Sequence, residues 1–280
     1  MVTNIDSLEG DLDIDFAVDS SRLQVLVVDD SATIRASLVR YLEDSRLPLD
    51  AHQAKSGTEA LEMMRARDYD IVFSDIEMPG LTGPEMLSAI QAEGHKCFAV
   101  MMSGASVEKG ADLGRSVGAY TYLHKPFSEH DVINCVQAYQ RMHQTARVLV
   151  VDDSPTVRKL ILRIVGASRF KTELDEAGSG EEALTKIGKG SYDIAFIDCN
   201  MPGIDGLQTV RRIKLRNSGV RVVMMSSHVE ATAVQAAQRE GVIAFLKKPF
   251  YPADIDAVLH KAFGLDRPVV ADKLPTAIVS

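Results

Sequence analysis

Three carboxylates that could act together recur in both halves of the sequence, each following an apolar run. Asp29 and Asp30 come after one run and Asp75 after another, and the copies are Asp152, Asp153 and Asp198. Two like charges 4 Å apart repel by about 4 kcal/mol at an effective dielectric near 20, so such a trio needs a cation. Hard oxygen ligands suit Mg²⁺ better than Zn²⁺. We therefore expect a Mg²⁺ site in each half.

An internal repeat places these carboxylates in register. Leu23 to Arg35 (LQVLVVDDSATIR) returns as Ala146 to Arg158 (ARVLVVDDSPTVR). Two further segments return at the same spacing: YDIVFSDIEMPGLTG as YDIAFIDCNMPGIDG, and YLHKPF as FLKKPF. A constant offset over several anchors indicates a duplicated domain.

The length of 280 residues fits two such domains. We assign residues 22–144 to a first domain and 145–265 to a second, with an acidic N-terminal tail at 1–21 and a C-terminal tail at 266–280. The acidic tail carries six acidic side chains and no basic one. Such a composition favours disorder, and its apolar residues could instead form a docking stripe: Ile5, Leu8, Leu12 and Phe16.

Short apolar runs alternate with helical patterns in each copy, which predicts a parallel sheet covered by helices. In the first copy we expect strands at Val25–Val28, Ile71–Ser74, Phe98–Met102 and Thr121–His124, and helices that begin at Ser31, Gly57, Pro84 and Ser128. The fold class is α/β: two flavodoxin-like doubly wound domains with five-stranded parallel sheets, whose sites lie at the carboxyl ends of the strands. The last helix of the first copy, about Glu129 to Gln144, leaves a short linker before the second copy.

Composition excludes several classes of function. A net charge of −8 without a basic stripe argues against direct binding to nucleic acid. No apolar run is long enough to span a membrane, and no secretory signal is present, so we expect a cytoplasmic protein. The three cysteines, Cys97, Cys135 and Cys199, are too far apart for a zinc site or a disulfide framework.

Four motifs occur in the same order in both copies: VVDDS, D-x-x-M-P-G, a serine that ends the fourth strand (MMSGAS, MMSSH) and K-P-F after the fifth. With these motifs the sequence resembles the receiver domains of bacterial two-component response regulators over nearly all of both halves. The resemblance implies that Asp75 and Asp198 accept phosphate from the phosphohistidine of a histidine kinase or a histidine phosphotransfer protein.

The same resemblance implies the roles of the remaining site residues. Mg²⁺ would be bound by Asp30 or Asp153, the acceptor aspartate, and the backbone carbonyl of Glu77 or Asn200, with Asp29 or Asp152 acting through water. Lys125 or Lys248 and the hydroxyl of Ser103 or Ser226 would contact phosphoryl oxygens. Tyr122 and Phe245 would turn inward on phosphorylation, and the bonds before Pro126 and Pro249 would be cis. A homodimer could form through the face of helix 4, strand 5 and helix 5.

Glu77 departs from the family pattern, because a neutral residue is commoner two positions after the acceptor. Its carboxylate could slow the attack of water on the phosphate, or it could pair with Lys125. His228 also lies where receivers tune dephosphorylation.

The preferred interpretation is a response regulator without a separate output domain, which signals or relays phosphate by protein contact and is not an enzyme beyond its own phosphorylation chemistry. The main alternative is a scaffold in which one receiver is locked and serves for dimerisation. A haloacid-dehalogenase-like phosphatase is disfavoured because Asp13-Ile14-Asp15 follows no apolar strand. A Rossmann reductase is disfavoured because Gly178-Ser179-Gly180 lacks the third glycine of the dinucleotide loop.

Overall fold

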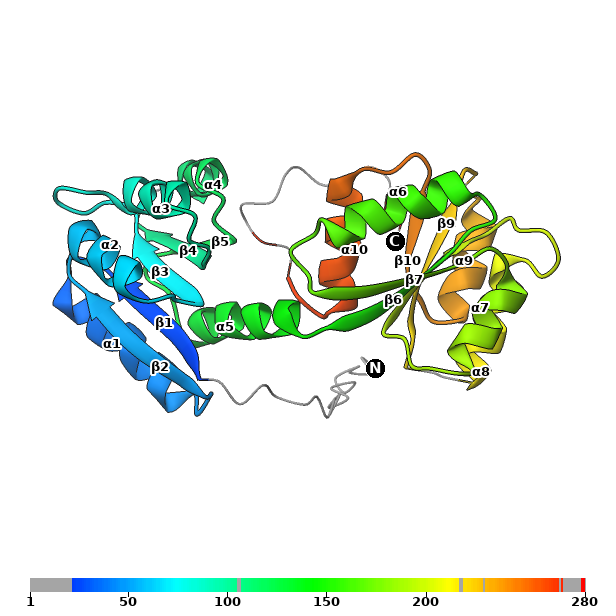
Figure 1. Ribbon diagram of the computed structural model, residues 1–280, viewed down its shortest axis with the longest axis horizontal. Helices are drawn as coiled ribbons and strands as arrows, with labels where there is room; N and C mark the ends of the chain where they lie inside the picture. Colours follow the sequence, from blue (N-terminus) through cyan, green and yellow to red (C-terminus); the bar gives the residue numbers. More distant parts are fainter. Residues whose placement is uncertain are drawn as a thin grey trace, which may run out of the picture.

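The computed structural model describes residues 22–104, 107–216, 219–228, 230–266, 268 and 278–279. These residues form two α/β domains that follow one another along the chain (Figure 1). The acidic tail, with its possible docking stripe of Ile5, Leu8, Leu12 and Phe16, lies outside the described residues.

The first domain is a five-stranded sheet with the strand order β2-β1-β3-β4-β5, in which every neighbouring pair is parallel. This confirms the expected doubly wound topology. Its elements are β1 (Leu23–Val28), α1 (Ala32–Asp44), β2 (Leu49–Ala54), α2 (Gly57–Ala66), β3 (Ile71–Asp75), α3 (Gly83–Ala92), β4 (Phe98–Ser103), α4 (Val107–Ser116), β5 (Thr121–His124) and α5 (Glu129–His143).

The second domain repeats this arrangement with the order β7-β6-β8-β9-β10. One further strand, β11, pairs antiparallel with β10 at the edge of the sheet, with Val279 opposite Phe245. Its elements are β6 (Ala146–Val151), α6 (Pro155–Gly166), β7 (Thr172–Ala177), α7 (Gly180–Ile187), β8 (Ile194–Asp198), α8 (Gly206–Arg216), β9 (Arg221–Ser226), α9 (Ala231–Arg239), β10 (Val242–Lys247), α10 (Pro252–Ala262) and β11 (Ile278–Val279).

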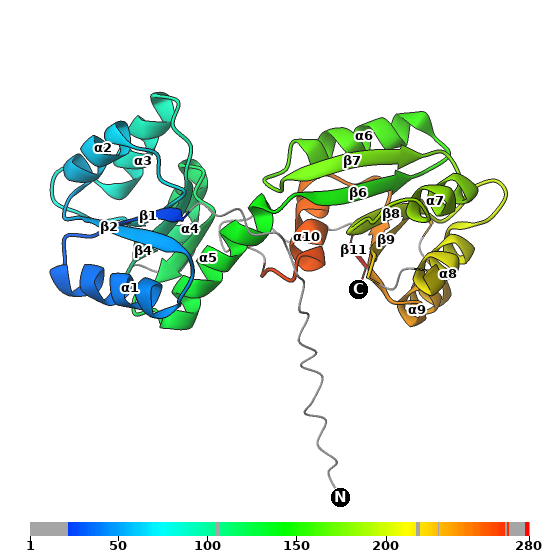
Figure 2. The ribbon, with the colours of Figure 1, turned by 60° about the horizontal axis from the view of Figure 1, so that its bottom comes forward.

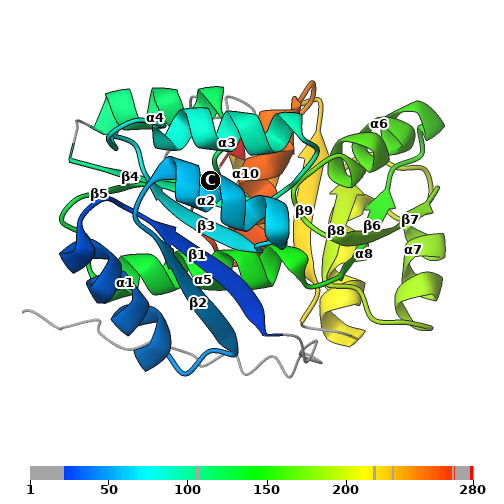
Figure 3. The ribbon, with the colours of Figure 1, turned by 60° about the vertical axis from the view of Figure 1, so that its left-hand side comes forward.

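The central strands are apolar throughout because helices cover both faces of each sheet, as Figure 3 shows for the first domain. In β1, Val25 and Val27 belong to one core cluster, whereas Leu26 and Val28 belong to the cluster on the other face. Helices begin at serine N-caps in equivalent places. Ser31 accepts a hydrogen bond from the backbone N–H of Ile34, and Ser154 accepts one from Val157.

The junction between the domains is short, as expected. Helix α5 ends at His143 and β6 begins at Ala146. The views of Figures 1 and 2 place α10 of the second domain beside the end of α5. One cluster of buried apolar side chains includes residues of both domains, so the core is continuous across the junction. No helix among the described residues is long and apolar enough to cross a membrane.

Candidate functional site

The predicted acidic trio of the first domain converges at the carboxyl edge of the sheet. Asp29 directly follows β1 and is fully buried, Asp75 ends β3 and is 7% exposed, and Asp30 is exposed. One carboxylate oxygen from each of the three lies within 4.8 Å of the others. The second domain forms the same cluster, with the same burial, from Asp152, Asp153 and Asp198.

Backbone and arginine contacts hold the buried aspartate that follows the first strand. The backbone N–H of Ser31 donates to Asp29 Oδ1 at 2.9 Å, and Arg35 Nη1 donates to the backbone carbonyl of Asp29 at 2.6 Å. Ser154 and Arg158 make the corresponding contacts with Asp152, at 2.9 and 2.7 Å. The two arginines were not among the predicted site residues. Both arginines occur at the same position of the first repeat segment, and this recurrence could have identified them as site residues.

Each site lysine lies between the two buried carboxylates. Lys125 Nζ is 2.6 Å from Asp29 Oδ2 and 3.0 Å from Asp75 Oδ2. In the second domain, Lys248 Nζ is 2.7 Å from Asp152 Oδ2 and 2.7 Å from Asp198 Oδ1. The peptide bonds that follow both lysines, before Pro126 and Pro249, are cis, as the resemblance implied. Each lysine therefore pairs both with the predicted acceptor and with the buried aspartate that follows the first strand.

Burial and charge both act on the protonation of these groups. Burial raises the pKa of Asp75 and of Asp198, and the nearby Asp29 or Asp152 adds to this, while the lysine opposes it. Burial alone would lower the pKa of Lys125, yet its hydrogen bonds to Asp29 and Asp75 raise that pKa overall. Each lysine thus stays a cation at neutral pH. Three carboxylates against one lysine leave negative charge for a further cation to neutralise.

The two predicted serines end the fourth strand of each sheet. Ser103 ends β4 and Ser226 ends β9, and both are 2% exposed. Their backbone carbonyls accept hydrogen bonds from the N–H groups of Lys125 and Lys248, at 2.9 and 2.8 Å. The Ser226 hydroxyl donates to the carbonyl of His228 at 2.7 Å. Each site serine is therefore hydrogen-bonded to the site lysine of its domain through the backbone.

The predicted switch aromatics point into the protein. Tyr122 of β5 is 3% exposed and Phe245 of β10 is 2% exposed. The Tyr122 hydroxyl donates to the backbone carbonyl of Ser103 at 3.0 Å. The tyrosine is thus joined to the strand end that carries the site serine.

The residues two positions after each acceptor lie at the exposed mouth of the site. Glu77 and Asn200 are both exposed. The backbone N–H of Asn200 donates to Asp198 Oδ2 at 3.2 Å. Within the described ranges, the ion pairs of Lys125 are those with Asp29 and Asp75, so the alternative pair of Glu77 with Lys125 is not formed.

Two glycines allow the third helix of each domain to start directly beside the predicted acceptor. A Cβ atom on Gly83 would lie 2.1 Å from the backbone oxygen of Asp75, and one on Gly206 would lie 2.2 Å from that of Asp198. A side chain at either position would push the helix off the acceptor strand. Both glycines end the repeated acceptor segment, and sequence reasoning assigned them no role.

A comparison with known families agrees with this geometry. The family described as the response regulator receiver domain matches residues 25–137 and 148–260. The chain belongs to this family. Both matches include the complete acidic trio, the serine and the lysine of one domain.

Characterised relatives match a stretch of this chain about as long as one domain. The transcriptional activator protein ExaE of Pseudomonas putida is 37% identical over 106 residues, which is 38% of this chain and 50% of ExaE. The positive alginate biosynthesis regulatory protein of Pseudomonas aeruginosa is 38% identical over 116 residues, 41% of this chain and 46% of that protein. The chain thus matches about half the length of these relatives.

A solved structure covers both domains. The crystal structure of a putative two-component system response regulator/GGDEF domain protein aligns with 87% of this chain and 98% of its own chain, with a TM-score of 0.60 and 23% sequence identity. At this identity the match supports the fold and not a shared function.

Proposed function

We propose that this chain is a two-component response regulator that accepts phosphoryl groups on Asp75 and Asp198. The donor is the phosphohistidine of a histidine kinase or a histidine phosphotransfer protein. The observation that carries the proposal is the position of the lysine in both domains: Lys248 Nζ lies 2.7 Å from both Asp152 and Asp198. Phosphoryl transfer depends on positioning and on neutralising the charge of the phosphoryl oxygens, and a cation held between two buried carboxylates is placed to do this beside the acceptor.

The transfer is a displacement at phosphorus. An acceptor carboxylate oxygen forms the new P–O bond while the P–N bond to the donor imidazole breaks, and the imidazole nitrogen keeps the electron pair. The protein contributes positioning and charge neutralisation. The lysine ammonium holds one phosphoryl oxygen and the hydroxyl of Ser103 or Ser226 holds another.

The acidic trio fits Mg²⁺ because three carboxylate oxygens lie within 4.8 Å and one carboxylate is exposed to solvent. Asp30 or Asp153, the acceptor, and the backbone carbonyl of Glu77 or Asn200 would hold the ion, with Asp29 or Asp152 acting through water. When bound, Mg²⁺ supplies positive charge to a phosphoryl oxygen.

Output in this proposal is by contact with other proteins in the cytoplasm, either as a signal or as a step in a phosphate relay. The chemistry is confined to gaining and losing the chain's own phosphate, without an enzymatic activity on other substrates. A homodimer through helix 4, strand 5 and helix 5 is a candidate assembly. The scaffold alternative is less favoured, because both domains keep the acceptor, the lysine and the serine in the same geometry.

Phosphorylation by acetyl phosphate, followed by intact-mass measurement, tests the proposal. We expect up to two added phosphates with Mg²⁺ and none with EDTA. Asp75→Ala and Asp198→Ala should each remove one phosphate, and the double variant should remove both. Unchanged labelling of the double variant would show that the acceptors are misassigned. Labelling of only one domain would favour the scaffold alternative.

A further inference from the structure

The helices that follow the two site lysines meet at the junction of the domains. Helix α5 follows Lys125 and ends at His143, and α10 follows Lys248 and ends at Ala262. Arg141, in the last turn of α5, donates from Nη1 to the carbonyls of Phe263 and Gly264, at 3.2 and 2.8 Å. These carbonyls directly follow α10. The end of one helix is therefore hydrogen-bonded to the end of the other (Figure 2).

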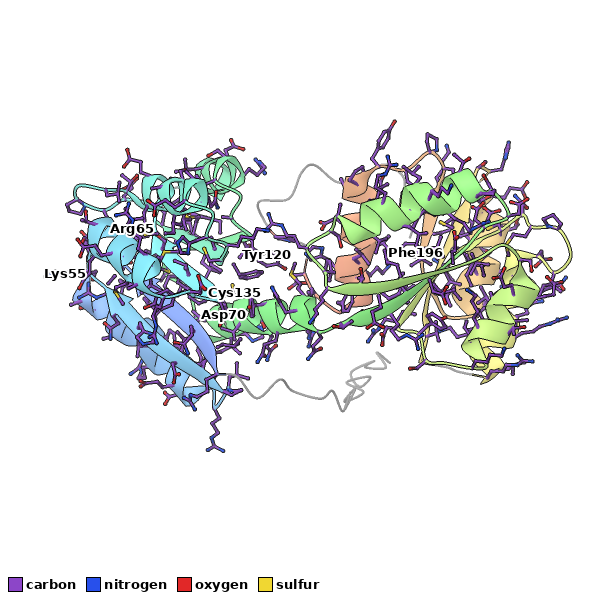
Figure 4. The ribbon with its side chains drawn as sticks, viewed as in Figure 1. Lys55, Arg65, Asp70, Tyr120, Cys135 and Phe196 are labelled. Carbon is purple, nitrogen blue, oxygen red and sulfur yellow. The ribbon has the colours of Figure 1, made fainter. Side chains whose placement is uncertain are left out.

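Aromatic rings connect the same two regions. Tyr120, directly before β5, is 4% exposed and stacks on His260 of α10, with ring centroids 6.0 Å apart and planes at 19°. On the side of the second domain, His260 also contacts Phe170 edge-on at 5.0 Å. On the side of the first domain, the ring of Tyr120 lies 4.2 Å from that of Phe98, the first residue of β4. Figure 4 shows Tyr120 on the side of the first domain that faces α10. The ring contacts thus run from β4 of one domain to α10 of the other.

The strand beside this contact also carries the switch tyrosine. Tyr122 lies in β5, two positions after Tyr120. A cavity of about 660 Å³ is lined by residues of β5 and α5, Tyr122 among them, and by residues that follow α10, including Leu265 and Pro268. The residues after α10 therefore lie against the strand that carries Tyr122, whose ring packs on the opposite face of the sheet, beneath α4.

Both switch rings are inward in the same structure in which these contacts between the domains are formed. The contacts between the domains therefore occur together with buried rings at both Tyr122 and Phe245. If the contacts between the domains require the inward rings, a group that favours one inward ring also favours the other, because coupling between sites is reciprocal.

From this geometry we propose that the second domain reads the phosphorylation state of the first: phosphate on Asp75 strengthens the packing of α10 on the β5–α5 side and thereby speeds phosphorylation of Asp198. The proposal rests on the proposed function, since it requires both aspartates to accept phosphate. It assigns the β5–α5 side of the first domain to the second domain of the same chain, in place of the homodimer contact considered above for that face.

Rates of Asp198 phosphorylation with and without phosphate on Asp75 test the coupling. The full chain and its Asp75→Asn variant are incubated with acetyl phosphate and Mg²⁺, and modification of Asp198 is followed by peptide mass mapping. We expect Asp198 to react about fivefold faster in the chain that can charge Asp75, the lower end of common coupling strengths. Equal or slower reaction in that chain would overturn the proposal.

Variants at the junction between the domains show whether the effect of Asp75 on the rate at Asp198 depends on the contacts there. Arg141→Ala should bring the ratio of rates close to one, because it removes both hydrogen bonds to the end of α10. Arg239→Ala is the matched control, since Arg239 is an exposed arginine in the last turn of α9, and it should leave the ratio unchanged. A ratio that persists in Arg141→Ala would overturn the proposed route.

Hydrogen exchange supplies a readout independent of the reaction at Asp198. In the Asp198→Asn chain, charging Asp75 should slow exchange of the α10 amides, and unchanged exchange there would count against the coupling. Failure of the coupling differs from failure of the proposed function. In the first case both aspartates are labelled at independent rates, and in the second an aspartate takes no phosphate at all.

Discussion

The ring of Tyr122 lies so close to Gly110 of α4 that no side chain fits between them. A Cβ atom on Gly110 would be 2.2 Å from Cε2 and 2.4 Å from Cζ of Tyr122. In the second domain the corresponding residues are Phe245, which lacks the hydroxyl, and Ala233, which is exposed. Glycine at position 110 therefore makes room for the inward tyrosine of the first domain.

Gly110→Ala should expel Tyr122 from beneath α4 and destabilise the first domain. Overpacking costs about 1–3 kcal/mol, whereas alanine in a helix gains roughly 0.5–1 kcal/mol over glycine. The net effect should be a loss of stability and greater exposure of Tyr122, measured by urea unfolding and by ¹⁹F NMR of fluorotyrosine. In a Tyr122→Ala background the same substitution should become stabilising, because the overpacking is gone and only the gain of alanine over glycine in a helix remains. A destabilisation of equal size in both backgrounds would rule out the ring contact as its cause.

Lys248→Ala should destabilise the second domain more than loss of a surface lysine would. The side chain of Lys248 is 18% exposed and that of its partner Asp152 is 1% exposed. Removing the cation leaves two buried carboxylates uncompensated, at a cost of about 1–3 kcal/mol, reduced from the usual value for buried pairs by partial solvation. Thermal unfolding in EDTA measures this effect.

The exposed neighbour Lys247 provides the matched control for that measurement. Lys247→Ala should change stability little, because a solvated lysine contributes little. Added Mg²⁺ should restore part of the stability of Lys248→Ala, since it supplies the missing positive charge. Equal effects of the two substitutions in EDTA would contradict the structural role of the Lys248 pairs.

Mg²⁺ should raise the melting temperature of both domains. A ligand that binds only the folded state stabilises by about 2.7 kcal/mol at a concentration of a hundred times its Kd. Asp30→Ala should remove most of this gain in the first domain and Asp153→Ala in the second, because each removes the exposed carboxylate of its trio. Asp44→Ala, at an exposed aspartate that ends α1, should keep the gain. Stabilisation by Mg²⁺ that survives in the double variant Asp30→Ala/Asp153→Ala would place the ion elsewhere.

The sequence predicted the central strands within one or two residues because their runs are apolar on both faces. Val25–Val28 forms the buried part of β1, and the edge strand β5 was also predicted, with its observed bounds of Thr121–His124. Strand β2 (Leu49–Ala54) was not located, because three of the six residues in its sequence, LDAHQA, are polar and interrupt any apolar run. Helix α4 was not located either, since its glycines weaken the helical signal.

The chemistry of the site was predictable and its packing was not. The repeat identified both acidic trios, because residues at strand ends meet at one edge of a parallel sheet. The resemblance to receiver domains added both lysines and both serines. The pairing of Lys125 with Asp29 depends on side-chain geometry that spacing does not encode. The contact of Tyr120 with His260 depends on how the two domains pack, which no local pattern reveals.

Phosphate on Asp75 should outlive phosphate on Asp198, because the residue at the mouth of each site differs. Glu77 places an exposed carboxylate where hydrolytic water must approach, and Asn200 places a neutral amide there. A charge near the reacting oxygens changes the barrier by about 1 kcal/mol in a solvated setting, or roughly fivefold in rate. The lifetime is measured after donor removal, in chains that keep a single acceptor.

Two mechanisms for Glu77 can be separated by exchanging the residues at the mouths of the two sites. In the first, the Glu77 carboxylate repels the attacking water and slows the loss of phosphate. In the second, Glu77 acts as a general base and speeds that loss. Under repulsion, Glu77→Asn in the Asp198→Ala background should shorten the lifetime on Asp75. The reciprocal Asn200→Glu in the Asp75→Ala background should lengthen the lifetime on Asp198. General-base action predicts the opposite change in both chains, and lifetimes that do not move would mean that neither side chain reaches the attacking water. Because the acceptor, lysine and serine stay in place in all four chains, a change in lifetime reports on the mouth residue alone.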